Sequence, residues 1–196
     1  MNTAPRLLDR SRAVPLLIGK HEDFLIVAGL AGAAKDIGNL TKESPNTFLL
    51  GGAMGGAAMV AAGLAITQPD KRVLLVTGDG ELLMALGSLA TIGAVQPKNL
   101  AIVCVDNECY GETGDQPTHT SFGIDLKATA EACGIKTTRL VTSEAEMAEA
   151  SALLRQSNGP VFVLLKVTGA PPPQYSRNWQ ASETKTAFRK ALLGKR

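Results

Sequence analysis

The sequence lacks the features that mark several classes of protein. It has only three cysteines in 196 residues, Cys104, Cys109 and Cys133, and none belongs to a Cys-x-x-Cys pair. An odd number of unclustered cysteines argues against a disulfide framework and against a metal–sulfur site, and favours reduced thiols in a reducing compartment. Internal repeats and low-complexity segments are also absent, so nothing indicates a second domain.

Long apolar runs and a large excess of charge are absent as well. No segment approaches the roughly 20 apolar residues that a membrane-spanning helix needs. The first twelve residues, MNTAPRLLDRSR, contain no apolar core of the signal-peptide type. The net charge of +2 is too small to indicate binding to nucleic acid or to a membrane surface. We therefore expect a cytoplasmic protein.

The chain nevertheless contains enough apolar material for one core. With 45% hydrophobic and 19% charged residues, its full length of 1–196 is most simply a single domain. The end of the chain differs in composition, because Gly169 is soon followed by three consecutive prolines. We expect residues 169–196 to form an extended tail that ends in a helix over 183–193.

Apolar runs alternate with helical stretches along the chain. Strands rich in Val, Ile and Leu are typical of a parallel sheet covered on both faces. The expected fold class is α/β, a doubly wound parallel sheet with helices on both faces, and ligands of such sheets bind beyond the carboxyl ends of the strands. The helices at 57–66 and 81–95 are apolar around most of their circumference and should be enclosed. Strands are predicted at 24–28, 47–50, 72–77, 100–105, 138–141 and 161–167, and helices at 57–66, 81–95, 126–133 and 144–156.

The most informative motif is Gly78-Asp79-Gly80, which directly follows a predicted strand. Asn107 follows the next strand, 27 residues beyond Gly80. The two glycines allow close approach of the backbone to a phosphate, and the first N–H groups of the following helix point at it. Asp79, the side-chain oxygen of Asn107 and a carbonyl just beyond are oxygen ligands of the kind that Mg²⁺ takes together with phosphates and water. A lone Gly-Asp-Gly can be only a tight turn, but the spaced Asn107 favours a metal–diphosphate site.

At these residues the chain resembles the thiamine diphosphate enzymes. Their shared pattern begins with Gly-Asp-Gly and ends in Asn, and here it reads GDGELLMALGSLATIGAVQPKNLAIVCVDN. The resemblance implies that Asp79, Asn107 and the main-chain carbonyl of Cys109 bind Mg²⁺. Asp106 replaces an Asn that is frequent in the family and is not a ligand. Met54 lies in a glycine-rich turn and would prop the cofactor in its bent shape, although it could be an ordinary core residue.

The same resemblance implies further cofactor contacts and a second chain. In this family a Glu in a separate pyrimidine-binding domain activates the cofactor, and the present chain has room for only one domain. We therefore expect a β-type subunit whose α-type partner carries that Glu, together with self-association. A large interface would cover the apolar segments around 30–62 and 82–92. The expected cofactor-binding residues are Gly52, Ala53, Met54, Gly78, Gly80, Glu81, Tyr110 and Thr113.

Within the family, the segment from Glu81 to Ser121 resembles sulfopyruvate decarboxylase β subunits and phosphonopyruvate decarboxylases. This implies decarboxylation of a small 2-oxo acid with thiamine diphosphate and Mg²⁺. Glu112 and His119 are the candidate catalytic residues, because each could supply a proton, although each could also be a solvated side chain. Asp115 stands where the relatives usually have Gly, and it adds a negative charge near the mouth of a site that accepts dianions in those relatives.

Other interpretations remain open. The β subunits of 2-oxo acid:ferredoxin oxidoreductases share this module, but they commonly carry cysteine sets for iron–sulfur clusters, unlike this chain. A non-catalytic module that binds the cofactor or a partner is a further alternative. Arg177 and Trp179 in the tail either close over an active site or dock the terminal helix. His21 is interpreted as part of a solvated turn.

Overall fold

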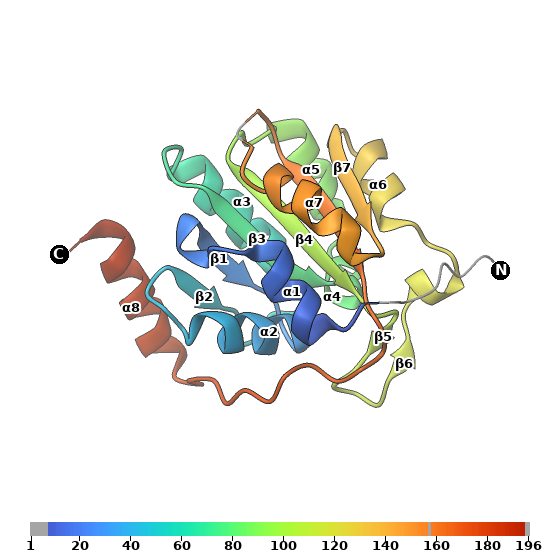
Figure 1. Ribbon diagram of the computed structural model, residues 1–196. Coiled ribbons are helices and arrows are strands. Elements are labelled where there is room, and N and C mark those ends of the chain that lie inside the picture. The colour runs from blue at the N-terminus through green and yellow to red at the C-terminus, as the bar shows by residue number, and fades with distance from the viewer. Residues whose placement is uncertain (1–7, 157, 195–196) are drawn as a thin grey trace.

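A computed structural model describes residues 8–156 and 158–194 of the chain. Six strands form one sheet in the order β2-β1-β3-β4-β8-β7, and every neighbouring pair is parallel (Figure 1). The predicted α/β class and all six predicted strands are confirmed. The prediction that the first twelve residues form no signal peptide falls partly on residues 1–7, which lie outside the described residues. The strands are β1 (Leu25–Ala28), β2 (Thr47–Leu49), β3 (Val73–Gly78), β4 (Leu100–Asp106), β7 (Thr137–Val141) and β8 (Val161–Lys166).

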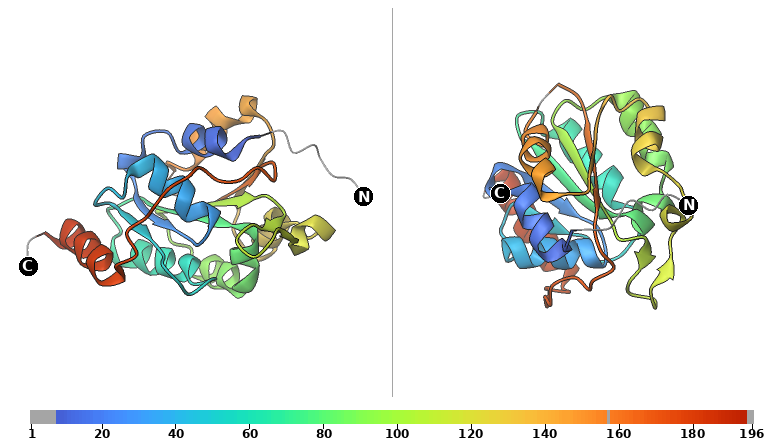
Figure 2. Two further views of the ribbon diagram at one scale, coloured as in Figure 1. Left: turned by 90° about the horizontal axis from the view of Figure 1, so that it is seen from below. Right: turned by 45° about the vertical axis from the view of Figure 1, so that its right-hand side comes forward.

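Helices cover both faces of the sheet. Successive side chains of a strand point to opposite sides, so the apolar strands present two apolar faces that need cover. One core contains Ile26, Leu74 and Val103, and the core on the other face contains Leu75 and Ile102. Figures 1 and 2 show the two helical layers on either side of the sheet. The first core is covered by α1 (Arg10–Ile18), α2 (Gly32–Thr41) and α7 (Met147–Leu153), and the second by α3 (Ala57–Thr67), α4 (Asp79–Met84), α5 (Gly87–Val95) and α6 (Leu126–Ala132).

Two predicted helices differ from the structure. The helix predicted at 81–95 is divided into α4 and α5. Between them, the N–H groups of residues 85, 88 and 89 each donate to the carbonyl three positions earlier, which makes tighter turns than an α-helix. The apolar sequence there has no periodic stripe that could locate this break. The helix predicted at 144–156 is a 3₁₀ turn (Glu144–Glu146) followed by α7.

The sequence pattern does not predict α1 or α2. Helix α1 contains Pro15, and α2 begins in a run of small residues that looks like a loop. Asp9 caps α1 by accepting a hydrogen bond from the N–H of Ser11 at 2.8 Å. Both helices begin at the carboxyl edge of the sheet or beside it, where they contribute to the cavity described below.

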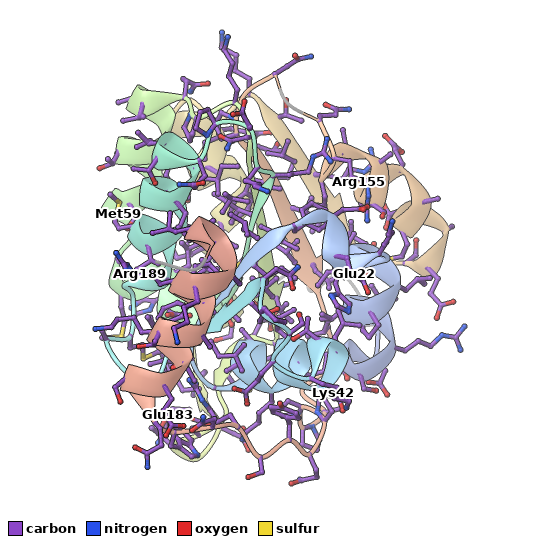
Figure 3. All side chains as sticks on the ribbon, turned by 90° about the vertical axis from the view of Figure 1, so that its left-hand side faces the viewer. Glu22, Lys42, Met59, Arg155, Glu183 and Arg189 are labelled. Carbon is purple, nitrogen blue, oxygen red and sulfur yellow. The ribbon has the colours of Figure 1, made fainter. Side chains whose placement is uncertain are left out.

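The outer surfaces of α3, α4 and α5 are more exposed than expected. Their inner residues are buried, but Met59, Ile66 and Met84 are 44%, 55% and 63% exposed. Met59 lies at the outer edge of the molecule in Figure 3. The prediction that these helices are enclosed is therefore wrong for the chain alone. No helix in the two described stretches combines the length and the apolar character needed to cross a membrane.

The C-terminal part of the chain forms an extended tail and a helix. Residues 167–180 run along the carboxyl edge of the sheet to α8 (Ala181–Leu193), which packs beside β2 (Figures 1 and 3). The rings of Phe48 and Phe188 are 5.6 Å apart at this contact. Arg177 donates to the carbonyls of Leu49 and Leu50 at 2.7 and 2.8 Å, so it anchors the tail at the end of β2. Trp179 stacks on Arg177 and is 70% exposed.

Candidate functional site

The carboxyl ends of the central strands border a cavity of about 450 Å³. The chain leaves β1 for β2 on one side and returns to β3 on the other, so the topological switch point lies between β1 and β3. Ligands of doubly wound sheets bind at this point. The walls come from the start of α1, the β1–α2 loop, the loop after β2, the start of α4, the loop after β4 and the tail. They include Arg10, Leu30, Ala31, Gly32, Lys35, Met54, Gly78, Asp79, Gly80, Glu81, Asn107, Cys109, Tyr110, Gly111, Glu112, Thr113, Asp115 and residues 169–172.

Three oxygen atoms converge in this cavity. The side-chain oxygen of Asn107 lies 3.2 Å from Asp79 Oδ1 and 3.1 Å from the carbonyl oxygen of Cys109. Neighbouring ligands of an octahedral Mg²⁺ are separated by about 3 Å, since each lies 2.0–2.1 Å from the ion. Turned by 180°, the Asn107 amide would instead donate its N–H groups to both oxygens. Asp79 Oδ1 and the Cys109 carbonyl oxygen therefore both face a position that suits a positively polarised group. Together with the Asn107 oxygen they form a set of oxygen ligands that fits a hard divalent cation.

The turn after β4 brings two of these oxygens together. Glu108, between Asn107 and Cys109, has a φ of 61°, a left-handed conformation that is uncommon for a residue with a side chain. Its N–H donates to Asp106 Oδ1 at 3.1 Å, which holds the turn. The Asn107 amide nitrogen lies 3.0 Å from Cys109 Sγ, so the turn also places the Cys109 side chain beside this amide.

Asp79 is a buried carboxylate held by two hydroxyl groups. It is 1% exposed, and its Oδ2 accepts hydrogen bonds from Thr118 at 2.5 Å and from Thr120 at 3.1 Å. Burial, and next the negative charge of Asp106, raise the pKa of Asp79 from 3.8 to about 6; the Thr118, Thr120 and Gly80 hydrogen bonds oppose this shift. The ionised form is thus disfavoured unless a cation is bound.

Among the described residues, Asp106 forms an ion pair and Asp79 does not. Lys166 Nζ, from the end of β8, lies 2.8 Å from Asp106 Oδ2 and 2.6 Å from Glu108 Oε1. Asp106 is 1% exposed and Glu108 is 8% exposed, so this ion pair is buried. It fixes the end of β4 against β8 and explains why a carboxylate is tolerated at residue 106.

Glu81 ties three segments together at the switch point. Its Oε2 accepts the Leu30 N–H at 3.1 Å and the Thr77 hydroxyl at 2.9 Å, and its Oε1 accepts the Gly55 N–H at 3.4 Å. Burial raises the pKa of this carboxyl group. A Cβ at residue 29 would overlap the carboxylate, so Gly29 is needed for the approach. Glu81 therefore shapes the cavity by holding the loops around it.

The outer rim carries charged side chains. The loop after β4 forms a hairpin of β5 (Cys109–Tyr110) and β6 (Gln116–Pro117). Glu112 from this hairpin lies 3.4 Å from Lys35 Nζ of α2, across the mouth of the cavity. Asp115, at a φ of 57°, adds a second carboxylate to the lining.

Comparison with known proteins identifies the domain that forms this cavity. Residues 36–165 match the C-terminal TPP-binding domain of thiamine pyrophosphate enzymes. The chain belongs to this family. The match includes the Gly78–Gly80 segment and Asn107, and so covers the residues from which the resemblance is inferred.

Relatives of the TPP-binding domain support the same assignment. The chain is 37% identical to the sulfopyruvate decarboxylase subunit beta of Methanothermobacter thermautotrophicus over 82% of its own length and 83% of that protein. It is 36% identical to the phosphonopyruvate decarboxylase of Streptomyces viridochromogenes over 78% of its length, but over only 38% of that protein. The benzoylformate decarboxylase of Polynucleobacter necessarius shares the fold, with a TM-score of 0.66 and 18% identity over 89% of this chain and 36% of that one.

The TPP-binding domain gathers most of the residues singled out in the sequence. Asp79, Asn107, Cys109 and Glu112 line the cavity, as do the predicted cofactor contacts Met54, Gly78, Gly80, Glu81, Tyr110 and Thr113. Gly52 and Ala53 are exposed and do not line it. His119 is also exposed and outside the lining, at the start of the 3₁₀ turn η2 (His119–Phe122).

Several residues of the site are not singled out by the sequence. The hydroxyls of Thr118 and Thr120 flank His119 and both bond Asp79, but Thr120 lies in a 3₁₀ turn, so no strand alternation marks them in the sequence. Lys166 is a single charge at the end of an otherwise apolar strand, which is the signal that could have found it. Arg10 and the β1–α2 loop reach the cavity only through the tertiary fold.

Proposed function

We propose that this chain is the diphosphate-binding subunit of a thiamine diphosphate- and Mg²⁺-dependent decarboxylase that acts on a small 2-oxo acid of the sulfopyruvate or phosphonopyruvate kind. The observation that carries the proposal is the convergence of the Asp79, Asn107 and Cys109 oxygens directly beyond Gly78. The names of the relatives support the reaction class.

The predicted metal ligands and cofactor contacts in the cavity have specific parts in this proposal. Asp79, Asn107 and the Cys109 carbonyl would hold Mg²⁺, and the backbone at Gly78 and Gly80 would lie against the diphosphate. Gly80 also lets the Tyr110 ring pack onto the backbone, since a Cβ there would overlap the ring. Met54, which lines the cavity, would support the cofactor in its bent shape.

The chemistry divides between the cofactor and the chain. When bound, thiamine diphosphate supplies the nucleophilic carbon and the electron sink for decarboxylation of a 2-oxo acid. The chain binds and orients the cofactor and provides a group for proton transfer. Glu112 is better placed for this than His119, because Glu112 lines the cavity. Glu112 also lies 3.4 Å from Lys35 Nζ, and this contact holds its side chain at the cavity.

A partner subunit completes the proposed enzyme. The exposed apolar residues on α3, α4 and α5 form a surface that an interface would cover. The relative from Streptomyces is matched over only 38% of its length, which leaves room there for a further domain. We propose an α-type, pyrimidine-binding partner that carries the activating Glu, and self-association of this chain in the assembly.

Calorimetric titration with thiamine diphosphate and Mg²⁺ tests the cofactor part. We expect metal-dependent binding that tightens when the co-purifying partner is present and that Asp79→Ala abolishes. Absence of binding with the partner present would reject the proposal. Circular dichroism of Asp79→Ala is the control, because it shows whether a loss of binding comes from a loss of folding.

A decarboxylation assay tests the reaction and the need for two chains. The complex should release CO₂ from sulfopyruvate or phosphonopyruvate, whereas the isolated chain should be almost inert. Strong decarboxylation by the pure single chain would contradict the partner's role. A complex that binds the cofactor but decarboxylates neither substrate would confine the proposal to cofactor binding.

A further inference from the structure

Thr118 is the most deeply buried hydroxyl residue at the metal-ligand end of the cavity. Its side chain is 0% exposed, and its hydroxyl donates to Asp79 Oδ2 at 2.5 Å. Thr120 lies 2.9 Å from Thr118 Oγ1 and 3.1 Å from the same carboxylate oxygen. A threonine has one hydroxyl proton, and that of Thr118 is directed to Asp79. One oxygen of Asp79 is thus held by the protein.

The other oxygen of Asp79 is the one that faces the proposed ligands. Oδ1 lies 3.2 Å from the Asn107 oxygen, whereas Oδ2 points to the threonines. A carboxylate can rotate about its last single bond, and hydrogen bonds to one oxygen fix the direction of the other. Groups that orient a metal ligand in this way commonly change metal affinity. Thr118 therefore acts on the ligand geometry through Asp79.

Thr118 also closes the hairpin that covers the cavity. Its N–H donates to the carbonyl of Glu108 at 3.0 Å, so residues 109–117 form a loop whose two ends meet at this residue. The same loop carries the Cys109 carbonyl and the rim residues Glu112, Thr113 and Asp115. One residue thus joins the orientation of Asp79 to the closure of the hairpin.

We infer that Thr118 is a positioning residue that couples metal binding by Asp79 to the order of the hairpin at 109–117. The inference rests on the proposed function, because it takes Asp79 as a metal ligand. Coupling between two sites is reciprocal, so a bound metal stabilises the hairpin and a closed hairpin tightens metal binding. A purely structural threonine would contribute to stability without linking these two properties.

The test compares Thr118 variants in the full-length chain, with Mn²⁺ and thiamine diphosphate as the probes. Mn²⁺ binding is measured by electron paramagnetic resonance, and hairpin order by amide hydrogen exchange of residues 109–117 with and without the metal. We expect Thr118→Val and Thr118→Ala to weaken Mn²⁺ binding by about 10- to 100-fold. Both should also lose the metal-dependent protection of the hairpin. Thr118→Ser keeps the hydroxyl and should restore both properties.

Two controls separate the possible outcomes. Thr41→Val removes another buried threonine hydroxyl, which donates to the Ile37 carbonyl within α2, and should leave metal binding and hairpin protection unchanged. Asp79→Asn should abolish Mn²⁺ binding. Should Asp79→Asn bind Mn²⁺ as the wild type does, the proposed function fails. If Asp79→Asn fails to bind but either folded variant without the hydroxyl behaves as wild type, the inference on Thr118 alone is overturned.

Discussion

Asp79 and Asp106 lie on either side of one hydroxyl group, that of Thr120. Its oxygen is 3.1 Å from Asp79 Oδ2 and 2.9 Å from Asp106 Oδ1, and both carboxylates are 1% exposed. Lys166 neutralises Asp106, but Asp79 forms no ion pair with any described residue. A buried carboxylate without its own cation costs stability. This asymmetry marks Asp79 as the group that a metal ion would neutralise.

The metal-free protein should therefore become more stable when Asp79 is replaced by Asn. The pKa of Asp79 is 3.8 in the unfolded state and is raised to about 6 in the folded state. The folded protein therefore binds the Asp79 proton more tightly than the unfolded protein does. The stabilisation by the bound proton is complete below pH 3.8 and is lost as the pH rises through 6. The difference corresponds to about 3 kcal/mol. Asp79→Asn is neutral at every pH and avoids this loss.

Urea unfolding of both proteins between pH 4 and pH 8, with a chelator present, checks this prediction. The stability gained by Asp79→Asn should approach about 3 kcal/mol at pH 8 and shrink toward pH 4. With Mg²⁺ and thiamine diphosphate added, the order should reverse, because only the wild type gains stability from binding. A pH-independent difference between the two proteins would contradict the assignment.

The Arg10–Asp36 pair should show strong coupling. Arg10 Nη2 and Asp36 Oδ2 are 2.6 Å apart, and their side chains are 5% and 1% exposed. Burial raises the pKa of Asp36 even though Arg10 opposes the shift. Removing one partner leaves a buried charge, so Arg10→Met or Asp36→Leu should each cost about 3–5 kcal/mol.

The double variant provides the control for this pair. Arg10→Met with Asp36→Leu should cost much less than the two single changes together, because no buried charge is left unpaired. Denaturant unfolding of the four proteins gives the coupling energy directly. Additive losses would mean that the pair contributes little beyond its separate contacts.

Two glycines should respond in opposite directions to alanine. At residue 29 a methyl group would displace the Glu81 carboxylate from Leu30 and Thr77, so Gly29→Ala should destabilise the fold by at least about 1–3 kcal/mol. Gly63 lies within α3 with no atom near a Cβ, so Gly63→Ala should stabilise the chain by roughly 0.5–1 kcal/mol. Thermal unfolding of the two variants measures both effects, and equal effects would refute the role given to Glu81.

The sheet and the proposed metal ligands were predictable because their signals are local. Strands such as Leu100–Asp106 are nearly continuous apolar runs, and parallel pairing brings the residues after β3 and β4 to one edge. Asp79 and Asn107 therefore become neighbours in space once the strands are placed. Helix α2 was not predictable in the same way, because its stability comes from packing on the sheet and from the buried Asp36 rather than from its small N-terminal residues.

The partners of the supporting residues could not be predicted, because each pairing joins segments that are distant in the sequence. Thr118 meets Asp79 across 39 positions, and Lys166 meets Asp106 across 60. His119 attracted the catalytic hypothesis by its chemistry, but its two neighbours face inward and leave it exposed. The exposure of the apolar residues on α3, α4 and α5 was also not predictable, because an apolar helix looks the same in the sequence whether a partner or the chain's own fold covers it.

A charge placed on the exposed face of α3 should separate association from folding. Ile66 is 55% exposed, so Ile66→Lys should leave the thermal stability of the isolated chain nearly unchanged. If this face meets a partner, a buried and unpaired lysine would cost several kcal/mol and weaken assembly by roughly 100-fold or more. Leu16→Lys is the matched control, because Leu16 is 47% exposed on α1, over the opposite face of the sheet. Sedimentation of each variant with the co-purifying partner measures the effect. Equal weakening by both variants would place the interface elsewhere, and no weakening by Ile66→Lys would leave the α3 face outside the assembly.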